Sequence, residues 1–358
     1  MIIQRYLIRE ISKPLAAVLG ILIVLFASYS AASILSDAVN GLLPTDTIAE
    51  LVGLKVLISL EVLIPVSLYL SVVLSFSGLY GDSEFTAMFA LGVTPAKRMS
   101  AVLTMSGYLA LAVAGLSLVV RPWAYEKLHE LSSHAEATLN VNAMEAGTFY
   151  VGQNGNRVIF LTHRDGPGAP AQDVFVQLRD GDGTKIIYAP LAQTAPRIGS
   201  EVHLSNAHIY EIGSGNGQDD QVLNARELTV SPDSSGGAPP GYSSVAASSA
   251  RLATSGSDGD IAEFQWRLST PLSTFLLGMM GIPLSRTKLR QARYAKFGTA
   301  ILIYSGYYLL CTSARTWVQH GMVAKFPGIW WAPALLALLL LVTLNGPKLD
   351  FKLRRRGA

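Results

Sequence analysis

The chain has 358 residues, of which 50% are apolar or aromatic and 15% are charged. Soluble domains carry about 25% charged residues, so this composition argues against a purely soluble protein. The 28 basic and 25 acidic residues give a formal net charge of +3, which is too small to indicate nucleic-acid binding. Cys311 is the single cysteine, which excludes an intrachain disulfide and a cysteine metal cluster.

Six apolar stretches are long enough to cross a membrane, because a helix needs about 20 mostly apolar residues to span about 30 Å of hydrocarbon. They cover residues 15–35, 52–77, 99–120, 268–285, 298–318 and 329–346. The basic start of the chain is also typical of a signal peptide, but the long first run and the later spans favour a retained helix. An even number of spans places both termini on the same side of the membrane.

Lysine and arginine gather in short segments on one side of the predicted spans. These segments are residues 5–13, 97–98, 286–296 and 348–356, whereas the opposite short loops contain only Lys325 among basic residues. Basic segments are retained in the cytoplasm, so we expect both termini to be cytoplasmic. Residues 121–267 then lie on the extracytoplasmic side.

The segment 121–263 predicts a β domain. After a short polar helix over residues 123–137, runs rich in Val, Ile, Phe and Tyr alternate with Gly, Asn, Asp and Pro. The runs cover residues 148–151, 157–162, 173–179, 185–191, 201–209 and 222–230. We expect about six or more antiparallel strands in a sandwich or jelly roll.

Two further features of this domain bear on its function. Phe175 is as apolar as its neighbours on the other strand face, which indicates either an open apolar groove or an ordinary two-sided core. Residues 231–260 are nearly all Ser, Gly, Ala, Pro and Asp, and this composition predicts a flexible linker.

The sequence lacks the common motifs of nucleotide hydrolysis and of hydrolytic enzymes. It contains no G-x-x-x-x-G-K-[ST] loop, no H-E-x-x-H and no G-x-S-x-G. We therefore expect no catalytic residue, no metal site and no cofactor in this chain.

The segment 82–95, between the second and third predicted spans, indicates a short amphipathic helix on the cytoplasmic side. Acidic residues stand at its start, where the helix dipole favours them, and apolar side chains recur at spacings i, i+3 and i+4. Such a helix either lies in the lipid interface or docks into a soluble partner, and its acidic start favours the partner. The candidate contact residues are Asp82, Glu84, Phe85, Met88 and Gly92.

Ionisable residues inside the predicted spans are functional candidates, because a charge costs several kcal/mol in the hydrocarbon. Lys55 and Arg315 fall near the outer ends of their spans, where they either hold an anionic lipid headgroup or extend to the interface. Glu61 lies deeper than Lys55 and is harder to explain as an interfacial residue.

Three stretches near the fourth span resemble a known family. They read E-F-Q-W-R-L-S-T-P-L from residue 263, G-I-P-L-S-R from residue 281, and R-Q-A-R-Y-A-K from residue 290. They resemble the E-x-x-W-R-x-x-x-P-L, P-L-S and R-Q-x-R-Y stretches of the LptF/LptG family of lipopolysaccharide export permeases. Residues 1–7 and 83–92 are also similar to this family. The matching motif positions are Glu263, Trp266, Arg267, Pro271, Pro283, Arg293 and Tyr294.

The resemblance implies the permease subunit of an ABC exporter in the inner membrane of a Gram-negative bacterium. Its implied partners are an LptG-like permease, an LptB-like ATPase dimer, and an LptC- and LptA-like periplasmic bridge that receives lipopolysaccharide for outer membrane biogenesis. The helix over residues 82–95 would be the coupling helix, with Glu84 as its acidic contact to the ATPase. A grooved β domain would carry acyl chains onward.

The chain departs from the family at the outer end of the first span. Family members have basic residues there that meet lipid A phosphates, whereas this chain has Tyr29, Ser30, Ser33 and Asp37. Lys55 and Arg315 are the candidates to supply that charge.

The expected architecture is an α-helical membrane protein with six transmembrane helices and an all-β, jelly-roll-like extracytoplasmic domain inserted between helices 3 and 4. Its parts are residues 1–120, 121–263 and 264–358, the last ending in a basic cytoplasmic tail. The alternative function is a non-transporting membrane scaffold whose β domain binds a periplasmic partner. A secondary transporter would need more coupled ionisable residues at mid-membrane than Glu61.

Overall fold

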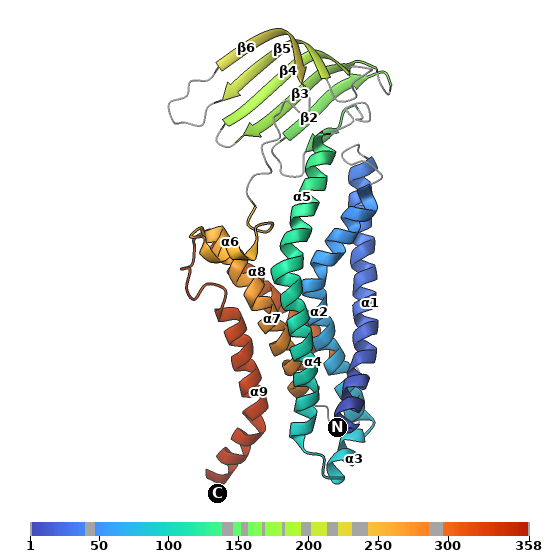
Figure 1. Ribbon diagram of the computed structural model, residues 1–358, viewed down its shortest axis with the longest axis vertical. Coiled ribbons are helices and arrows are strands. Elements are labelled where there is room, and N and C mark those ends of the chain that lie inside the picture. Colours follow the sequence, from blue (N-terminus) through green and yellow to red (C-terminus); the bar gives the residue numbers. More distant parts are fainter. Residues whose placement is uncertain are drawn as a thin grey trace. The chain divides into compact units, whose positions relative to one another are not determined.

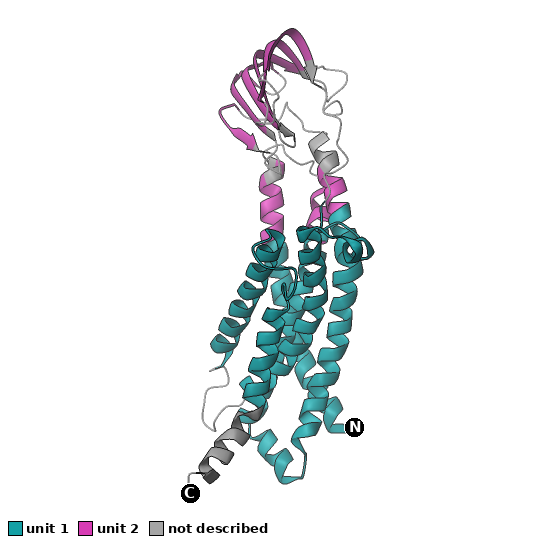
Figure 2. Cartoon of the chain, turned by 90° about the vertical axis from the view of Figure 1, so that its left-hand side faces the viewer, with its two compact units in different colours: residues 1–28, 54–126, 242–358 teal, residues 29–53, 127–241 magenta. Residues whose placement is uncertain are grey.

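The computed structural model describes residues 2–39, 47–137, 146–151, 157–166, 169–180, 183–194, 202–212, 221–230, 243–285 and 296–356. The chain divides into two compact units, shown in different colours in Figure 2. The helical unit comprises Met1–Ser28, Leu54–Glu126 and Tyr242–Ala358, and the sheet unit comprises Tyr29–Gly53 and Lys127–Gly241.

The six apolar stretches of the sequence fall in helices, and further helices lie between them (Figure 1). They are α1 (Ile2–Val39), α2 (Ile48–Gly81), α3 (Glu84–Ala90), α4 (Pro95–Gly115), the π-helix η2 (Leu116–Val120), α5 (Arg121–Ala137), α6 (Ser249–Thr254), α7 (Asp258–Leu284), α8 (Phe297–Gln319) and α9 (Trp331–Arg356).

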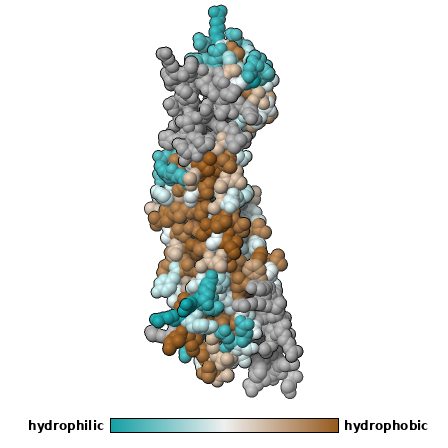
Figure 3. Space-filling model, turned by 90° about the vertical axis from the view of Figure 1, so that its right-hand side faces the viewer, coloured by the Kyte–Doolittle hydropathy of each residue, from teal (hydrophilic) through white to brown (hydrophobic). Residues whose placement is uncertain are grey.

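Four helical runs of the described residues are long and apolar enough to cross a membrane. They are Ile2–Ser36, Ile48–Gly81, Pro95–Ser132 and Phe297–Gln319, and Trp331–Leu344 is a shorter apolar helix. Apolar side chains cover much of the helical surface in Figure 3. The prediction of a helical membrane protein is thus confirmed. The other two predicted spans, residues 268–285 and 329–346, fall in α7 and α9, and α7 begins with several charged residues.

Very close contacts hold α7 against its neighbours in the helical unit. A methyl group placed on Gly278 would lie 2.1 Å from the hydroxyl oxygen of Ser106 in α4, and one on Gly281 would lie 2.7 Å from Val72 in α2. Glycine at these two positions therefore lets the helix backbones approach in the manner usual for membrane helices.

A proline inside α1 explains another contact between helices. Pro14 has no N–H, so the carbonyl of Glu10 lacks its usual donor within the helix. The hydroxyl of Ser75 in α2 donates a hydrogen bond of 2.9 Å to that carbonyl. This contact satisfies the unpaired acceptor and joins α1 to α2.

The sheet unit contains six antiparallel strands, each paired with the next one in the chain. They are β1 (Phe149–Val151), β2 (Arg157–Arg164), β3 (Ala171–Asp180), β4 (Gly183–Thr194), β5 (Val202–Ile212) and β6 (Gln221–Val230). The predicted strands are present, but the described strands form one sheet in sequential order. They do not form the two sheets of a sandwich or jelly roll, because each short connection returns the chain to the neighbouring strand.

The two faces of the sheet differ in burial. Cross-strand neighbours Val176, Ile187 and Ile209 share a face whose central residues are buried. The opposite face carries an aromatic row, defined as Phe149, Phe160, Phe175, Tyr188 and His208, which pair in register across five strands. The apolar Phe175 thus belongs to this second, partly exposed face.

A hydrogen bond fixes a local distortion of the sheet beside the aromatic row. Asp173 has a positive φ of 51°, which is uncommon for a residue with a side chain. The hydroxyl of Tyr188 donates a 2.6 Å hydrogen bond to the Asp173 carboxylate. This bond raises the pKa of Tyr188 above its usual value.

The predicted linker 231–260 is only partly covered by the described residues. Residues 231–242 lie outside them, but residues 243–260 contain α6 and the start of α7, and Leu252 of α6 is buried. The second half of the predicted linker thus contains helical structure, and the flexibility of the segment stays a prediction. A distant side chain, Arg267, bonds several carbonyls of this part.

Candidate functional site

The helix predicted over residues 82–95 is α3, a helix of seven residues with a sharp turn at each end. Ser83, which precedes it, has a positive φ of 58°, and Gly92, which follows it, has a φ of 79°. Pro95 then starts α4 at the position where its fixed φ suits a helix. Because seven residues are too few for a stable isolated helix, side-chain contacts must hold α3 in place.

Phe85 anchors α3 to the helical unit. Its side chain is fully buried, and its ring lies 5.1 Å from that of Phe76 and 4.8 Å from that of Tyr80. Met88 is partly buried and packs against the same core. Of the five predicted contact residues, Phe85 is therefore closed to any partner.

The outward surface of α3, which we call the α3 surface, combines one acidic residue with apolar residues. Asp82 and Gly92 are exposed, Phe89 is 38% exposed and Leu91 is 84% exposed. An acidic and apolar surface of this kind suits a soluble protein partner better than anionic lipid.

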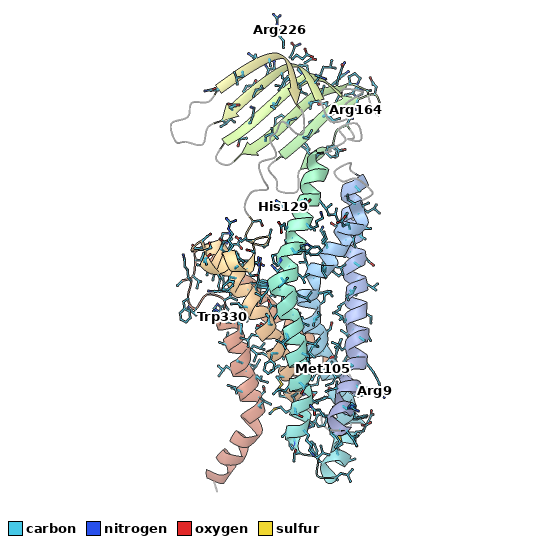
Figure 4. All side chains as sticks on the ribbon, in the orientation of Figure 1. Arg9, Met105, His129, Arg164, Arg226 and Trp330 are labelled. Carbon is cyan, nitrogen blue, oxygen red and sulfur yellow. The ribbon has the colours of Figure 1, made fainter. Side chains whose placement is uncertain are left out.

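Glu84, the first residue of α3, contacts the N-terminal part of the chain. The Tyr6 hydroxyl of α1 donates a hydrogen bond of 2.7 Å to the Glu84 carboxylate. Arg9, labelled in Figure 4, is exposed on the same part of α1, as are Arg5 and Lys13. The acidic start of α3 thus contacts α1, a helix that also carries exposed basic residues.

Five ionisable side chains form a buried charge cluster in another part of the helical unit. They are Glu61 of α2, Arg121 at the start of α5, Glu263 and Arg267 of α7, and Arg315 of α8. Glu263 accepts hydrogen bonds from all three arginines, at 2.9 Å from Arg121, 3.0 Å from Arg267 and 2.7 Å from Arg315. Glu61 accepts from Arg121 and, at 2.8 Å, from Ser117.

The members of the charge cluster differ in exposure. The side chain of Arg315 is 25% exposed, whereas those of Glu61, Arg121, Glu263 and Arg267 are buried. Three guanidinium groups and two carboxylates leave one formal positive charge. Arg315 is therefore the member best placed to meet an anion from outside the cluster.

Sequence reasoning identified Glu61, Glu263, Arg267 and Arg315 separately but missed Arg121 and Ser117. Arg121 lies 142 residues before Glu263, so no local pattern reveals the pair. The sequence pattern that could have indicated Arg121 is an arginine directly after an apolar run. The π-helix η2, which precedes Arg121, widens the helical turn that carries Ser117.

Arg267 also binds the segment that precedes and begins α6. Its guanidinium donates to the carbonyls of Ala247 at 2.9 Å and Val245 at 2.9 Å, and to the hydroxyl of Ser249 at 3.0 Å. The two neighbouring motif residues thus make different contacts. Arg267 binds the segment before α6, whereas the ring centre of Trp266 lies 5.2 Å from the guanidinium carbon of Arg315.

A pocket adjoins the charge cluster between α2, α7 and α8. It is lined mainly by aromatic and small polar side chains, and Glu61 stands at one side of it. The lining includes Pro65, Trp266, Ser273, Tyr304, Tyr307, Tyr308 and Cys311. Ser273 and Tyr307 are hydrogen-bonded to each other. Because each hydroxyl already has a partner, the pocket is suited to apolar groups.

The remaining predicted residues lie apart from the charge cluster. Lys55 is half-buried on α2 and forms no ion pair among the described residues. Pro271 and Pro283 lie inside α7. Arg293 and Tyr294 lie outside the described residues. The described part of the chain holds no group of three or more His, Cys, Asp or Glu side chains that could hold a metal ion.

Comparison with known proteins gives a consistent result over almost the whole chain. Residues 5–345 match the family model described as lipopolysaccharide export system permease LptF/LptG. The lipopolysaccharide export system permease protein LptF of Escherichia coli K12 is 28% identical over 350 residues, covering 96% of this chain and 94% of that protein. Proteins of the same name from Escherichia coli O157:H7 and Shigella flexneri match to the same extent.

Proposed function

The chain belongs to the LptF/LptG family of lipopolysaccharide export permeases, and from this we propose that it is the permease subunit of an ABC exporter. In this proposal it extracts lipopolysaccharide from the inner membrane and passes it to a periplasmic bridge. The family and the long apolar helices already make it a multi-pass inner-membrane component of lipopolysaccharide export rather than an enzyme. The observation that carries the mechanism is α3.

In the proposed mechanism, α3 couples this chain to an LptB-like ATPase dimer that hydrolyses ATP. The sequence has no phosphate-binding loop of its own, so the energy must come from a partner. Exposed Asp82, Leu91 and Gly92 offer an acidic and apolar contact surface. Buried Phe85 would fix the helix from behind, and Glu84, which accepts the Tyr6 hydroxyl through Oε2, would meet a cation of the ATPase with its other carboxylate oxygen.

The proposed topology has six spans, with both termini in the cytoplasm and the sheet unit in the periplasm. The apolar halves of α7 and α9 would supply the two spans beyond the four longest helices. An LptG-like permease would pair with the helical unit, and LptC- and LptA-like proteins would receive lipid from the sheet unit. The aromatic row gives this sheet an apolar surface suited to acyl chains.

Arg315 and Lys55 are the proposed contacts for lipid headgroup phosphates. Arg315 is the exposed member of a charge cluster with an excess positive charge, and its guanidinium lies beside the aromatic pocket. Replacing both residues with glutamine should weaken the stimulation of ATP turnover by lipopolysaccharide in the reconstituted complex. Unchanged stimulation would reject this role.

The function is tested by purifying the chain from its native membrane in mild detergent, followed by mass spectrometry and an ATPase assay. We expect an ATPase and a second permease to co-purify with the wild-type chain, and ATP turnover to fall in the Glu84→Ala variant. Glu126→Ala, an exposed glutamate of α5, is the matched control. A chain that purifies without an ATPase would favour the alternative of a non-transporting scaffold.

A further inference from the structure

Arg98 occupies an unusual environment for a basic residue beside a membrane. It stands in the first turn of α4, directly after α3, and is only 7% exposed. Its guanidinium carbon lies 4.6 Å from the ring centre of Phe89, 5.0 Å from that of Phe85 and 5.8 Å from that of Tyr80. We call Arg98 and these three rings the aromatic cage.

The aromatic cage stabilises the charge of Arg98 without a carboxylate. Among the residues that the structure describes, Arg98 forms no ion pair, and it donates a hydrogen bond from Nη1 to the Tyr80 hydroxyl. Its Nε is buried and has no acceptor in the described part of the chain. A buried charge without an ionic partner is costly, whereas an apolar side chain of similar length would fill the space between rings at no such cost.

The cage joins three consecutive segments of the chain. Tyr80 belongs to the end of α2, Phe85 and Phe89 belong to α3, and Arg98 belongs to α4. Left-handed residues at Ser83 and Gly92 flank α3, so no continuous helix joins it to α2 or α4. Attraction between the guanidinium and the ring faces holds α3 against both neighbours.

A second contact holds the other end of α3. The Tyr6 hydroxyl donates to Glu84 at the first residue of the helix, which links α3 to α1. The Arg98 end leads through α4 to α7, because Ser106 of α4 lies against Gly278 of α7. A displacement of α3 can therefore reach the rest of the helical unit by two routes. One runs through Tyr6 to α1, and the other runs through the cage to α4 and then to α7.

We propose that Arg98 is a positioning residue that transmits displacement of α3 to α4 and α7, and that Tyr6 transmits it to α1. This inference rests on the proposed function, in which a partner ATPase moves α3. Removing the guanidinium would leave the α3 surface able to bind the ATPase, since Arg98 itself is buried and, of that surface, only Phe89 touches it. The loss would appear as ATP turnover that no longer drives lipid movement.

The test compares Arg98→Met and Arg98→Lys in the complete complex reconstituted in vesicles that contain lipopolysaccharide. ATP turnover and lipopolysaccharide released per ATP are measured separately. Lys97→Met is the matched control, because Lys97 is the exposed neighbouring cation of the same helical turn. We expect Arg98→Met to keep the ATPase bound and active but to release at least about fivefold less lipid per ATP, the lower range of coupling between two sites.

Arg98→Lys should recover part of that loss, because an ammonium group also binds aromatic faces. An unchanged yield of lipid per ATP in Arg98→Met would overturn the proposal, as would a parallel fall of ATPase binding, turnover and export that lysine does not relieve. Should Arg98→Met fail to fold, Tyr6→Phe, which removes one hydroxyl, tests the same transmission at the other end of α3, and an unchanged yield would count against it. A wild-type chain that recruits no ATPase would instead refute the proposed function.

Discussion

The helical unit buries arginines in two regions, the charge cluster and the aromatic cage, and stabilises their charges differently. In the charge cluster, Glu263 accepts hydrogen bonds of 2.7–3.0 Å from three guanidinium groups. In the aromatic cage, three rings surround Arg98 at 4.6–5.8 Å. Ion pairs with hydrogen bonds fix angles and distances, whereas a cation over ring faces has no single required direction.

This difference indicates that the two regions have different mechanical tasks. The charge cluster joins α2, α5, α7 and α8 and also holds the segment before α6 through Arg267. The aromatic cage holds only the short helix α3 and its two neighbours. We expect the charge cluster to act as a fixed frame and the cage to carry displacement of α3 to α4.

The largest expected effect comes from removing the shared carboxylate of the charge cluster. Glu263→Gln leaves three guanidinium groups with only Glu61, and loss of one partner from a buried ion pair costs about 3–5 kcal/mol. Thermal unfolding of the detergent-purified chain, followed by tryptophan fluorescence, should show a much lower midpoint. The control Glu126→Gln changes an exposed carboxylate, and equal midpoints for both variants would contradict the fixed frame.

A smaller effect is expected where α4, which carries Arg98, meets α7, which carries Glu263. A methyl group on Gly278 would overlap the Ser106 hydroxyl at 2.1 Å, and overpacking of this kind costs about 1–3 kcal/mol. Gly278→Ala should therefore lower the unfolding midpoint, and lipid export per ATP should fall with it. Gly306→Ala in α8 meets nothing within 4 Å and serves as the control; a loss there as large as that of Gly278→Ala would show that packing is not the cause.

The smallest effect is expected at an ion pair that is not buried. Lys185 and Glu211 of the sheet unit are joined at 2.8 Å, but both side chains are more than 40% exposed. Exposed pairs contribute about 0–1 kcal/mol, so Lys185→Gln should change the midpoint little. Unfolding of the full chain at low and high salt measures this, and a loss comparable to that of Glu263→Gln would mean that burial does not set the strength of these ion pairs.

The sequence predicted the features that depend on local patterns. Long apolar runs became α1, α2, α4 and α8, six β-rich runs became six strands, and the segment 82–95 contains α3. In each case hydrophobic periodicity or turn residues within about 20 positions were sufficient.

Features that depend on distant partners were not predicted. The Ser- and Ala-rich residues 243–260 lack apolar periodicity, yet they contain α6 and the start of α7, and Arg267 bonds carbonyls of this segment. Arg121 pairs with Glu61 60 residues earlier and with Glu263 142 residues later. Phe85 was expected to contact a partner, but it is buried against Phe76. The spacing of apolar residues in α3 could not show which side of the helix packs against the rest of the chain.

The central claim, that the α3 surface is where the ATPase binds, is tested most directly by cysteine crosslinking. Cys311 is the single cysteine and is buried, so Cys311→Ser gives a cysteine-free chain. In that background, Leu91→Cys on the α3 surface is compared with Met322→Cys, which is 73% exposed in the connection between α8 and α9. We predict that only Leu91→Cys crosslinks to the ATPase in native membranes; a crosslink from Met322→Cys, or labelling of Leu91→Cys from the periplasmic side, would contradict the account.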